Sequence, residues 1–174
     1  MNPLHQMTVP THRQMLSALI GQLAKAADTG TDSSTILAGR LAPDMFPLAT
    51  QIRFSCLQSL ECMDRLTGDG VRGADSVREV TAIEEAVALI EETVETLGQA
   101  DPARWNGAES RAIEIALPIG VTFDMTGADY VRDWALPQFY FHIVTAYAIM
   151  RQAGVDLGKA DYVPYMFAYA RKPG

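Results

Sequence analysis

The sequence has 174 residues, of which 48% are hydrophobic and 20% are charged. This length suits one domain that buries a continuous core without disulfides or metal, and the composition is that of a globular protein rather than a disordered or membrane-embedded one. The net charge is −7 and the 14 basic residues are scattered, which disfavours binding to nucleic acids. We therefore expect a single domain over residues 1–174, with neither nucleic acid nor membrane as a partner.

The cellular compartment is indicated by the N-terminus and by the cysteines. The first residues lack the charged start and apolar run of a signal peptide, and no segment approaches the length that spans a membrane. The two cysteines, Cys56 and Cys62, are six residues apart, which on one helix turns them about 240° from each other. They are expected to be small apolar residues in a reducing compartment rather than a redox or metal pair. A cytoplasmic location follows as the expectation.

Two helices are expected in the first part of the chain. Apolar residues recur at intervals of three and four and predict an amphipathic helix that starts at Thr11, directly after a proline, and stops at Gly30. The mixed connection over 31–47 contains one short helical turn around Ser34–Ala38. A second helix is expected from Leu48 to Gly68, with small and polar residues halfway along its core face.

The middle of the chain predicts a third helix and a hairpin. Apolar residues from Val80 to Leu97 alternate steps of three and four without a break, which is typical of a helix packed in a bundle. Trp105 is expected to close over the end of that bundle. Between Ala112 and Met125 the pattern changes to alternation, split by Pro118 and Gly120, which predicts a small β-hairpin. Because a lone hairpin is marginal in water, it must pack on the helices or on a partner chain.

The last long helix is expected over Thr126–Gln152, with Thr126 and Asp129 forming a capping box. It is apolar on almost every side, so it must be surrounded by other helices or by a second subunit. Pro137 lacks a backbone donor and clashes with the preceding turn, so the helix should bend there. The tail that follows is rich in aromatic residues and is expected to pack onto the bundle.

His142 is the histidine that lies inside this last helix, whereas His5 and His12 fall near the N-terminus. Helical metal sites commonly place two imidazoles three or four residues apart, and His142 has no such neighbour. Two interpretations of His142 stay open. It is either a core group satisfied by polar residues of the second helix, or part of a pocket lined by them. The polar residues that lie one turn apart on that helix are Gln51, Ser55 and Ser59.

Other polar candidates are few. Asp44 lies just before the second helix. Three roles are consistent with this position: a helix cap, an acceptor that tightens the loop, or a site residue. Tyr140 and Tyr147 are seven residues apart on one stripe and are typical of an amphipathic interface. No nucleophile motif, phosphate loop or dinucleotide fingerprint is present, so no cofactor is expected.

Two motifs carry a family resemblance. They are Arg-Leu-Ala-Pro-Asp-Met-Phe-Pro-Leu over Arg40–Leu48, and Leu-Pro-Gln-Phe-Tyr-Phe-His over Leu136–His142 followed by Thr-Ala-Tyr over Thr145–Tyr147. Because of these two motifs, the chain resembles an uncharacterised domain-of-unknown-function family of the DinB/YfiT-like metalloenzyme superfamily. The resemblance extends from Val9 to about Asp161. The resemblance implies a mainly all-α fold, a four-helix bundle of up-down-down-up order that is often a homodimer. The small β-hairpin precedes its last long helix.

Some branches of that superfamily are thiol-dependent transferases that hold a divalent metal with three histidines, one from the second helix and a pair spaced HxxxH late in the chain. This sequence departs from the pattern. Its second helix has no histidine, and His142 has no partner four residues away on either side. We therefore expect no metal site, and the resemblance carries over only the fold and the tendency to form dimers.

The leading hypothesis is a cytoplasmic, dimeric bundle that binds a small molecule or acts as an interaction module, without the metal triad. Its pocket would involve Asp44, Gln51, Tyr140 and His142. One rival is a metal- or thiol-dependent transferase-like enzyme that uses His142 with Asp44 or His12 as ligands or as an acid–base pair. The other is a purely structural homodimer, with no pocket near His142 and an extensive apolar contact through the last helix or the hairpin.

Overall fold

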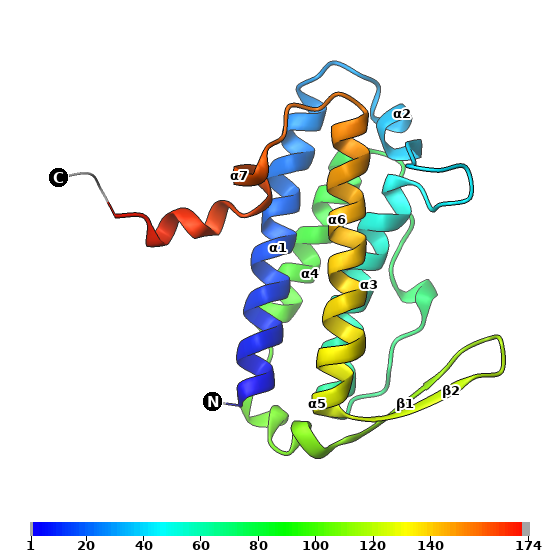
Figure 1. The fold of residues 1–174 in the computed structure, drawn as a ribbon, viewed down its shortest axis with the longest axis vertical. Coiled ribbons are helices and arrows are strands. Elements are labelled where there is room, and N and C mark those ends of the chain that lie inside the picture. Colours follow the sequence, from blue (N-terminus) through cyan, green and yellow to red (C-terminus); the bar gives the residue numbers. More distant parts are fainter. Residues whose placement is uncertain (1, 172–174) are drawn as a thin grey trace.

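A computed structural model describes residues 2–171, in which four long helices run side by side (Figure 1). They are α1 (Pro3–Ala27), α3 (Leu48–Thr67), α4 (Ile83–Gly98) and α6 (Leu136–Gln152). In Figure 1 the chain ascends in α1 and α6 and descends in α3 and α4, and the long connection between α3 and α4 runs back along the bundle. The order is therefore up-down-down-up, and the fold is the mainly helical bundle that we expected.

The α1 helix begins at Pro3 rather than at Thr11. The Asn2 side chain caps it by accepting the backbone N–H of Leu4 at 2.8 Å, and proline occupies a first-turn position where its missing N–H costs nothing. Pro10 consequently lies inside the helix, where a proline costs about 3 kcal/mol. The apolar side chains of these first turns are buried, and their burial offsets that cost.

The core lies between the four long helices. α3 packs against α4 and α6, and α1 packs against the same two helices. Trp105 is fully buried beside the N-terminus of α1, as predicted, and its carbonyl accepts the Asn2 side-chain amide at 2.8 Å. Other large and fully buried side chains are Met15, Leu16, Leu19, Leu23, Ile36, Leu48, Ile52, Leu66, Ile90, Tyr130 and Phe139. Within residues 2–171, no helix combines the length and the apolar character needed to cross a membrane.

Two connections between the long helices contribute ordered structure to the fold. The short α2 (Ser33–Ala38) lies where one helical turn was expected, and the Asp32 side chain accepts the backbone N–H of Thr35 at its start. α4 begins at Ile83 rather than at Val80, although Val80 is buried as its periodicity indicated. Val80 contributes to the core from the extended segment that leads into the helix.

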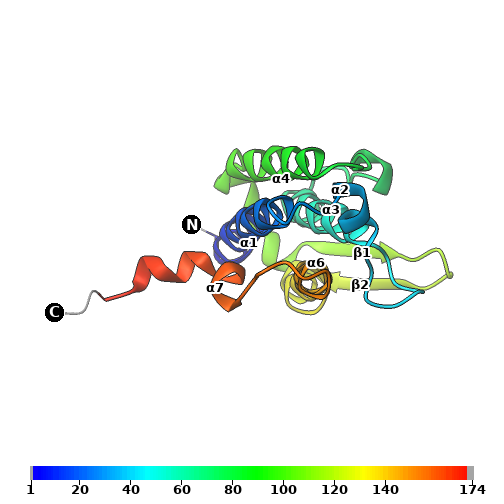
Figure 2. The same ribbon diagram turned by 90° about the horizontal axis from the view of Figure 1, so that it is seen from above.

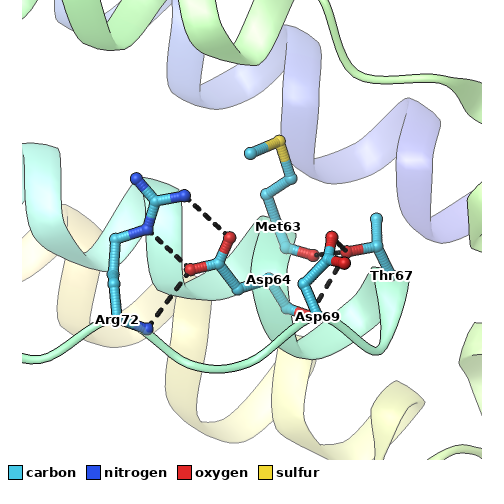
Figure 3. Close-up of polar contacts among 5 residues, drawn as sticks. All are labelled: Met63, Asp64, Thr67, Asp69 and Arg72. Carbon is cyan, nitrogen blue, oxygen red and sulfur yellow. Dashed lines mark hydrogen bonds and ion pairs between the residues drawn. The ribbon is translucent and has the colours of Figure 1, made fainter.

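Hydrogen bonds and an ion pair join the end of α3 to the connection that follows it (Figure 3). Gly68 takes a left-handed conformation with a φ of 79°, and its N–H returns to the carbonyl of Asp64. The Asp64 carboxylate accepts both Nε and Nη2 of Arg72, at 2.6 and 2.8 Å. The Thr67 hydroxyl lies 2.8 Å from the Asp69 carboxylate. These contacts fix the direction in which the long connection to α4 leaves the bundle.

The predicted hairpin is present. β1 (Ala112–Ala116) pairs antiparallel with β2 (Thr122–Thr126), and Ile113 and Ile115 of β1 are buried. Both strands extend from the lower end of the bundle past α6 (Figure 2). The ring of Phe123 in β2 lies 5.6 Å from that of Trp134, which joins the hairpin to the last helical segment.

The last helical segment has three parts rather than one. α5 (Gly127–Tyr130) is capped by the Thr126 hydroxyl, which accepts the backbone N–H of Asp129 at 3.2 Å. A π-helical turn over Val131–Ala135 then leads into α6, whose first turn contains Pro137. π-Turns and prolines are both recognised causes of helix irregularity. The bend expected at Pro137 stays a prediction, and the irregular turn of this segment lies directly before Pro137.

The tail packs onto the bundle only in part. α7 (Lys159–Tyr162) contacts α1, and Tyr162 and the following Tyr165 are half-buried. A 3₁₀ segment, Pro164–Tyr169, then leaves the bundle (Figures 1 and 2). The expectation of a packed tail is correct for its first tyrosines and wrong for Phe167 and Tyr169, which are 67% and 82% exposed.

Candidate functional site

The candidate site lies where α6 faces α3. Nδ1 of His142 lies 2.8 Å from Oε1 of Gln51, and the imidazole is buried apart from a small exposed fraction. Nε2 of Gln51 in turn donates to the carbonyl of Phe46 at 3.1 Å. That second bond fixes the orientation of the amide, because only its nitrogen can donate to a carbonyl. The amide oxygen therefore faces His142, as an acceptor.

This arrangement determines where the proton of the ring lies. Since Oε1 of Gln51 can only accept, Nδ1 of His142 must carry the hydrogen. Burial lowers the pKa of the imidazole to about 4, so the ring is neutral at physiological pH. Its Nε2 then has a free lone pair. Nε2 makes no hydrogen bond within residues 2–171, and it keeps some contact with solvent.

Aromatic rings surround the imidazole. The rings of Phe54 and Phe141 lie 5.2 and 5.3 Å from it, and the ring of Phe46 lies 5.4 Å from that of Phe54. Phe46 and Phe141 are 58% and 54% exposed. We call Phe46, Phe54 and Phe141 the aromatic frame. These rings were not predicted as site residues, although Phe46 and Phe141 both lie within the two family motifs.

The structure does not bring all four predicted pocket residues together. Tyr140 is two residues from His142, so on a helix the two side chains point about 160° apart. Tyr140 lies instead near Tyr165, and burial followed by that neighbouring phenol raises its pKa. Asp44 is exposed in the turn before α3, and its carboxylate makes no hydrogen bond within the described range. Of the four, Gln51 and His142 are in contact.

The small polar residues of α3 do not reach His142 either. The hydroxyl of Ser55 donates to the carbonyl of Gln51 at 2.9 Å, and that of Ser59 donates to the carbonyl of Ser55 at 2.8 Å. Both are satisfied within their own helix, a common arrangement for buried serines. Of the three partners considered for His142, the structure selects Gln51.

The two N-terminal histidines lie elsewhere in the core. His5 packs edge-on against Trp105 with ring centres 5.2 Å apart, and His12 packs against Phe139 at 4.4 Å. His12 is buried, its Nε2 has no partner in the described part of the chain, and burial lowers its pKa to about 3. Neither imidazole is hydrogen-bonded to His142.

Burial of His12 predicts a loss of stability in mild acid. The ring is protonated below about pH 6.5 in the unfolded chain but only below about 3 in the folded one, so the unfolded state binds more protons as the pH falls. The contribution is fully present above pH 6.5 and is lost between 6.5 and 3. From pH 7 to pH 5 this ring should lower the free energy of unfolding by about 2 kcal/mol. Urea unfolding of the wild type and of His12→Leu at both pH values measures the difference; equal pH dependence in the two would contradict it.

The residues present do not fit the metal triad of the superfamily. The second long helix, α3, contains no histidine and offers His142 only the amide of Gln51, and Gln138 and Ala146 lie four residues from His142. Among residues 2–171 no group of three or more histidine, cysteine, aspartate or glutamate side chains is placed to share one ion. Cys56 and Cys62 are both buried and unbridged, and burial raises the pKa of both thiols, that of Cys56 to about 12. They are poor ligands and poor nucleophiles.

A solved structure supports the class that the fold indicates. The crystal structure of a DinB family member protein from Shewanella denitrificans is similar to this chain, with a TM-score of 0.79 and 28% sequence identity over 98% of this chain and 94% of that one. No curated protein matches the sequence. The molecule is thus a DinB-like helical bundle.

The family itself is identified by the sequence match. The family described as domain of unknown function (DUF1993) matches residues 4–163, which is most of the chain. The chain belongs to this family. The match confirms the resemblance drawn from the two motifs and covers slightly more of the N-terminus than they indicated.

Proposed function

We propose that the protein is a cytoplasmic binding module that recognises a small molecule at Nε2 of His142, without the superfamily metal. The observation that carries the proposal is the fixed orientation of the Gln51 amide. It holds His142 in one tautomer and leaves Nε2 as the unprotonated nitrogen, and the partly exposed ring of Phe141 lies beside the imidazole. Preorganisation of this kind lowers the cost of binding a ligand.

The chemistry of the site defines the ligand class. A neutral imidazole nitrogen accepts one hydrogen bond, and the surrounding phenylalanines favour an apolar or aromatic body. No Asp, Glu, Lys or Arg occurs in α6 before Arg151, so a charged ligand gains nothing from this helix at the site. The ligand is a small neutral molecule with an aromatic or apolar body and one O–H, N–H or S–H donor.

The same features weigh against the transferase-like enzyme. An efficient general base has a pKa near the working pH, whereas that of His142 is about 4. The side chain that orients the ring is an amide rather than a carboxylate, so it does not stabilise a protonated imidazole. Asp44 and His12 make no hydrogen bond to His142 within residues 2–171. The geometry therefore supports binding rather than proton transfer.

NMR tests the proposal directly, with p-cresol as the probe. Long-range ¹H–¹⁵N correlation spectra should show His142 protonated at Nδ1, and addition of p-cresol should shift the signal of its Nε2. His142→Phe should weaken p-cresol binding about tenfold, the worth of one hydrogen bond. Tyr140→Phe is the matched control and should bind as the wild type, because Tyr140 lies on another side of α6. Protonation at Nε2, or equal affinity of the two variants, would refute the proposal.

A homodimer is the second candidate, and the surface of α6 favours it. This helix carries no charged residue from Leu136 to Met150, yet Phe141 and Val144 are exposed on its outer side. An exposed apolar helix face is typical of a surface that another subunit covers. We propose that two copies associate through this side of the molecule, and this homodimer differs from the purely structural one in that it keeps the His142 site.

A further inference from the structure

We propose that two copies of the chain exchange their C-terminal arms, so that the arm of each copy occupies an apolar groove beside α6 of the other. The arm is defined here as Pro164–Tyr169, and the groove as the pocket lined by Val144, Tyr147, Lys159 and Tyr162. This inference goes beyond the His142 site and shares none of its residues. It deepens the proposed homodimer by naming the contact that forms it.

The arm is apolar and is not covered by the rest of the molecule. It contains no charged residue, and Met166, Phe167 and Tyr169 are all more than half exposed. Both views show it leaving the bundle rather than lying along it (Figures 1 and 2). A single helical segment of this length does not hold its shape in water without packing. A projecting segment with two exposed aromatic rings is therefore expected to pack against an apolar surface of another molecule.

The base of the arm is anchored on α1. The Tyr165 hydroxyl donates to Sδ of Met15 at 3.3 Å, and its ring belongs to the half-buried set that packs against the core. Just before it, Lys25 forms an ion pair with Asp161 at 2.8 Å. Because its base is anchored on α1, the arm points away from the bundle as a directed element.

The groove beside this base suits an aromatic side chain. It has a volume of about 230 Å³, and its walls are Val144 and Tyr147 of α6 and Tyr162 of α7. A cavity of about 150 Å³ already accommodates benzene, so one phenylalanine ring fits. The chain's own arm does not occupy this groove, since none of its residues lines it. Lys159 leaves one edge polar, where the Tyr169 hydroxyl finds solvent or a partner.

A second copy of the chain covers the arm and fills the groove at once. Tyr162 lines the groove and lies two residues before Pro164, so arm and groove adjoin on the same side of the molecule. A two-fold axis near the base of the arm places each arm over the other copy's groove, and such a contact closes without further growth. Two reciprocal arms, each with two aromatic rings of about 150–250 Å², remove about 600–1,000 Å² of arm surface from water. The surfaces that they cover lose a similar area, and the total of about 1,200–2,000 Å² is that of a standard stable interface.

Light scattering on size-exclusion fractions of the full chain tests association. The wild type should be a dimer, and Phe167→Ala combined with Tyr169→Ala should raise the dissociation constant at least about 30-fold. Ile119→Ala removes an equally exposed apolar side chain from the hairpin turn and should leave the dimer unchanged. A wild type that remains a monomer at 100 µM, or a double variant that dimerises normally, overturns the proposal.

Cysteine cross-linking distinguishes arm exchange from any other dimer. Two single variants, Val144→Cys and Phe167→Cys, are mixed and oxidised, and the native cysteines do not interfere because both are buried. A disulfide-linked dimer should form in the mixture and not in either variant alone, since a disulfide needs Cβ atoms within about 4.5 Å. Dimers by light scattering without this cross-link would refute arm exchange and leave the homodimer standing. A disulfide within one chain carrying both substitutions, at monomer size, would also refute it.

Discussion

Replacement of Arg72 by methionine is expected to lower the free energy of unfolding by about 3 kcal/mol. The Asp64 carboxylate is 5% exposed at the end of α3, and two guanidinium hydrogen bonds from Arg72 compensate its burial (Figure 3). Without them the carboxylate keeps a single long bond, 3.4 Å from the backbone N–H of residue 72. We place the loss at the lower end of the range for broken buried pairs, because the guanidinium is itself partly exposed.

Urea unfolding of the purified variant measures this loss, and two controls interpret it. Arg132→Met removes an ion pair whose partners, Asp129 and Asp133, are exposed, so it should cost about 0.5 kcal/mol or less. Asp64→Leu combined with Arg72→Met removes the buried charge together with its partner and should lose less than Arg72→Met alone. If the double variant is the less stable of the two, the desolvated carboxylate is not the cause.

The helices were predictable because their signals are periodic and local. The apolar spacing of α3 and α4 locates both helices within a few residues, and Gly68 ends α3 in the left-handed conformation that glycine favours. The predicted start of α1 at Thr11 is wrong, because Pro10 indicates a boundary that the helix does not have. Asn2 and Pro3 are a sufficient start signal, but their effect depends on the burial of the first two turns. That burial comes from Trp105 and other residues distant in sequence.

The candidate site was predicted only in part, because it too depends on contacts between residues that are distant in sequence. Gln51 was among the possible partners of His142 because the two helices had to pack, and the structure joins the two side chains. The predicted pocket also includes Tyr140, although its position two residues from His142 directs it to another side of α6. The aromatic frame and the π-helical turn before Pro137 depend on how α3, the loop before it and α6 meet in space. No pattern within one segment encodes that arrangement.

Gly127 was also not singled out, and it makes the second large prediction. It begins α5, and a Cβ at this position would overlap the carbonyl oxygen of Ala108 and lie 3.1 Å from Cδ2 of Leu66. The obstacle is a backbone atom of the 3₁₀ segment Ala108–Ser110, which no change of rotamer removes. Gly127→Ala should therefore lower the free energy of unfolding by about 3 kcal/mol, the upper part of the range for overpacking.

The matched control is the same substitution at Gly21, inside α1, where a Cβ would meet nothing within 4 Å. Alanine is the better helix former, so Gly21→Ala should raise the free energy of unfolding by about 0.5–1 kcal/mol. The two variants add the same methyl group to helical residues, and only the surroundings differ. Opposite signs in paired urea titrations would show that close approach of α5 to the Ala108–Ser110 segment is what requires glycine. Equal effects at the two positions would instead mean that the junction between hairpin and last helix yields without loss, and that the orientation of α6 does not depend on it.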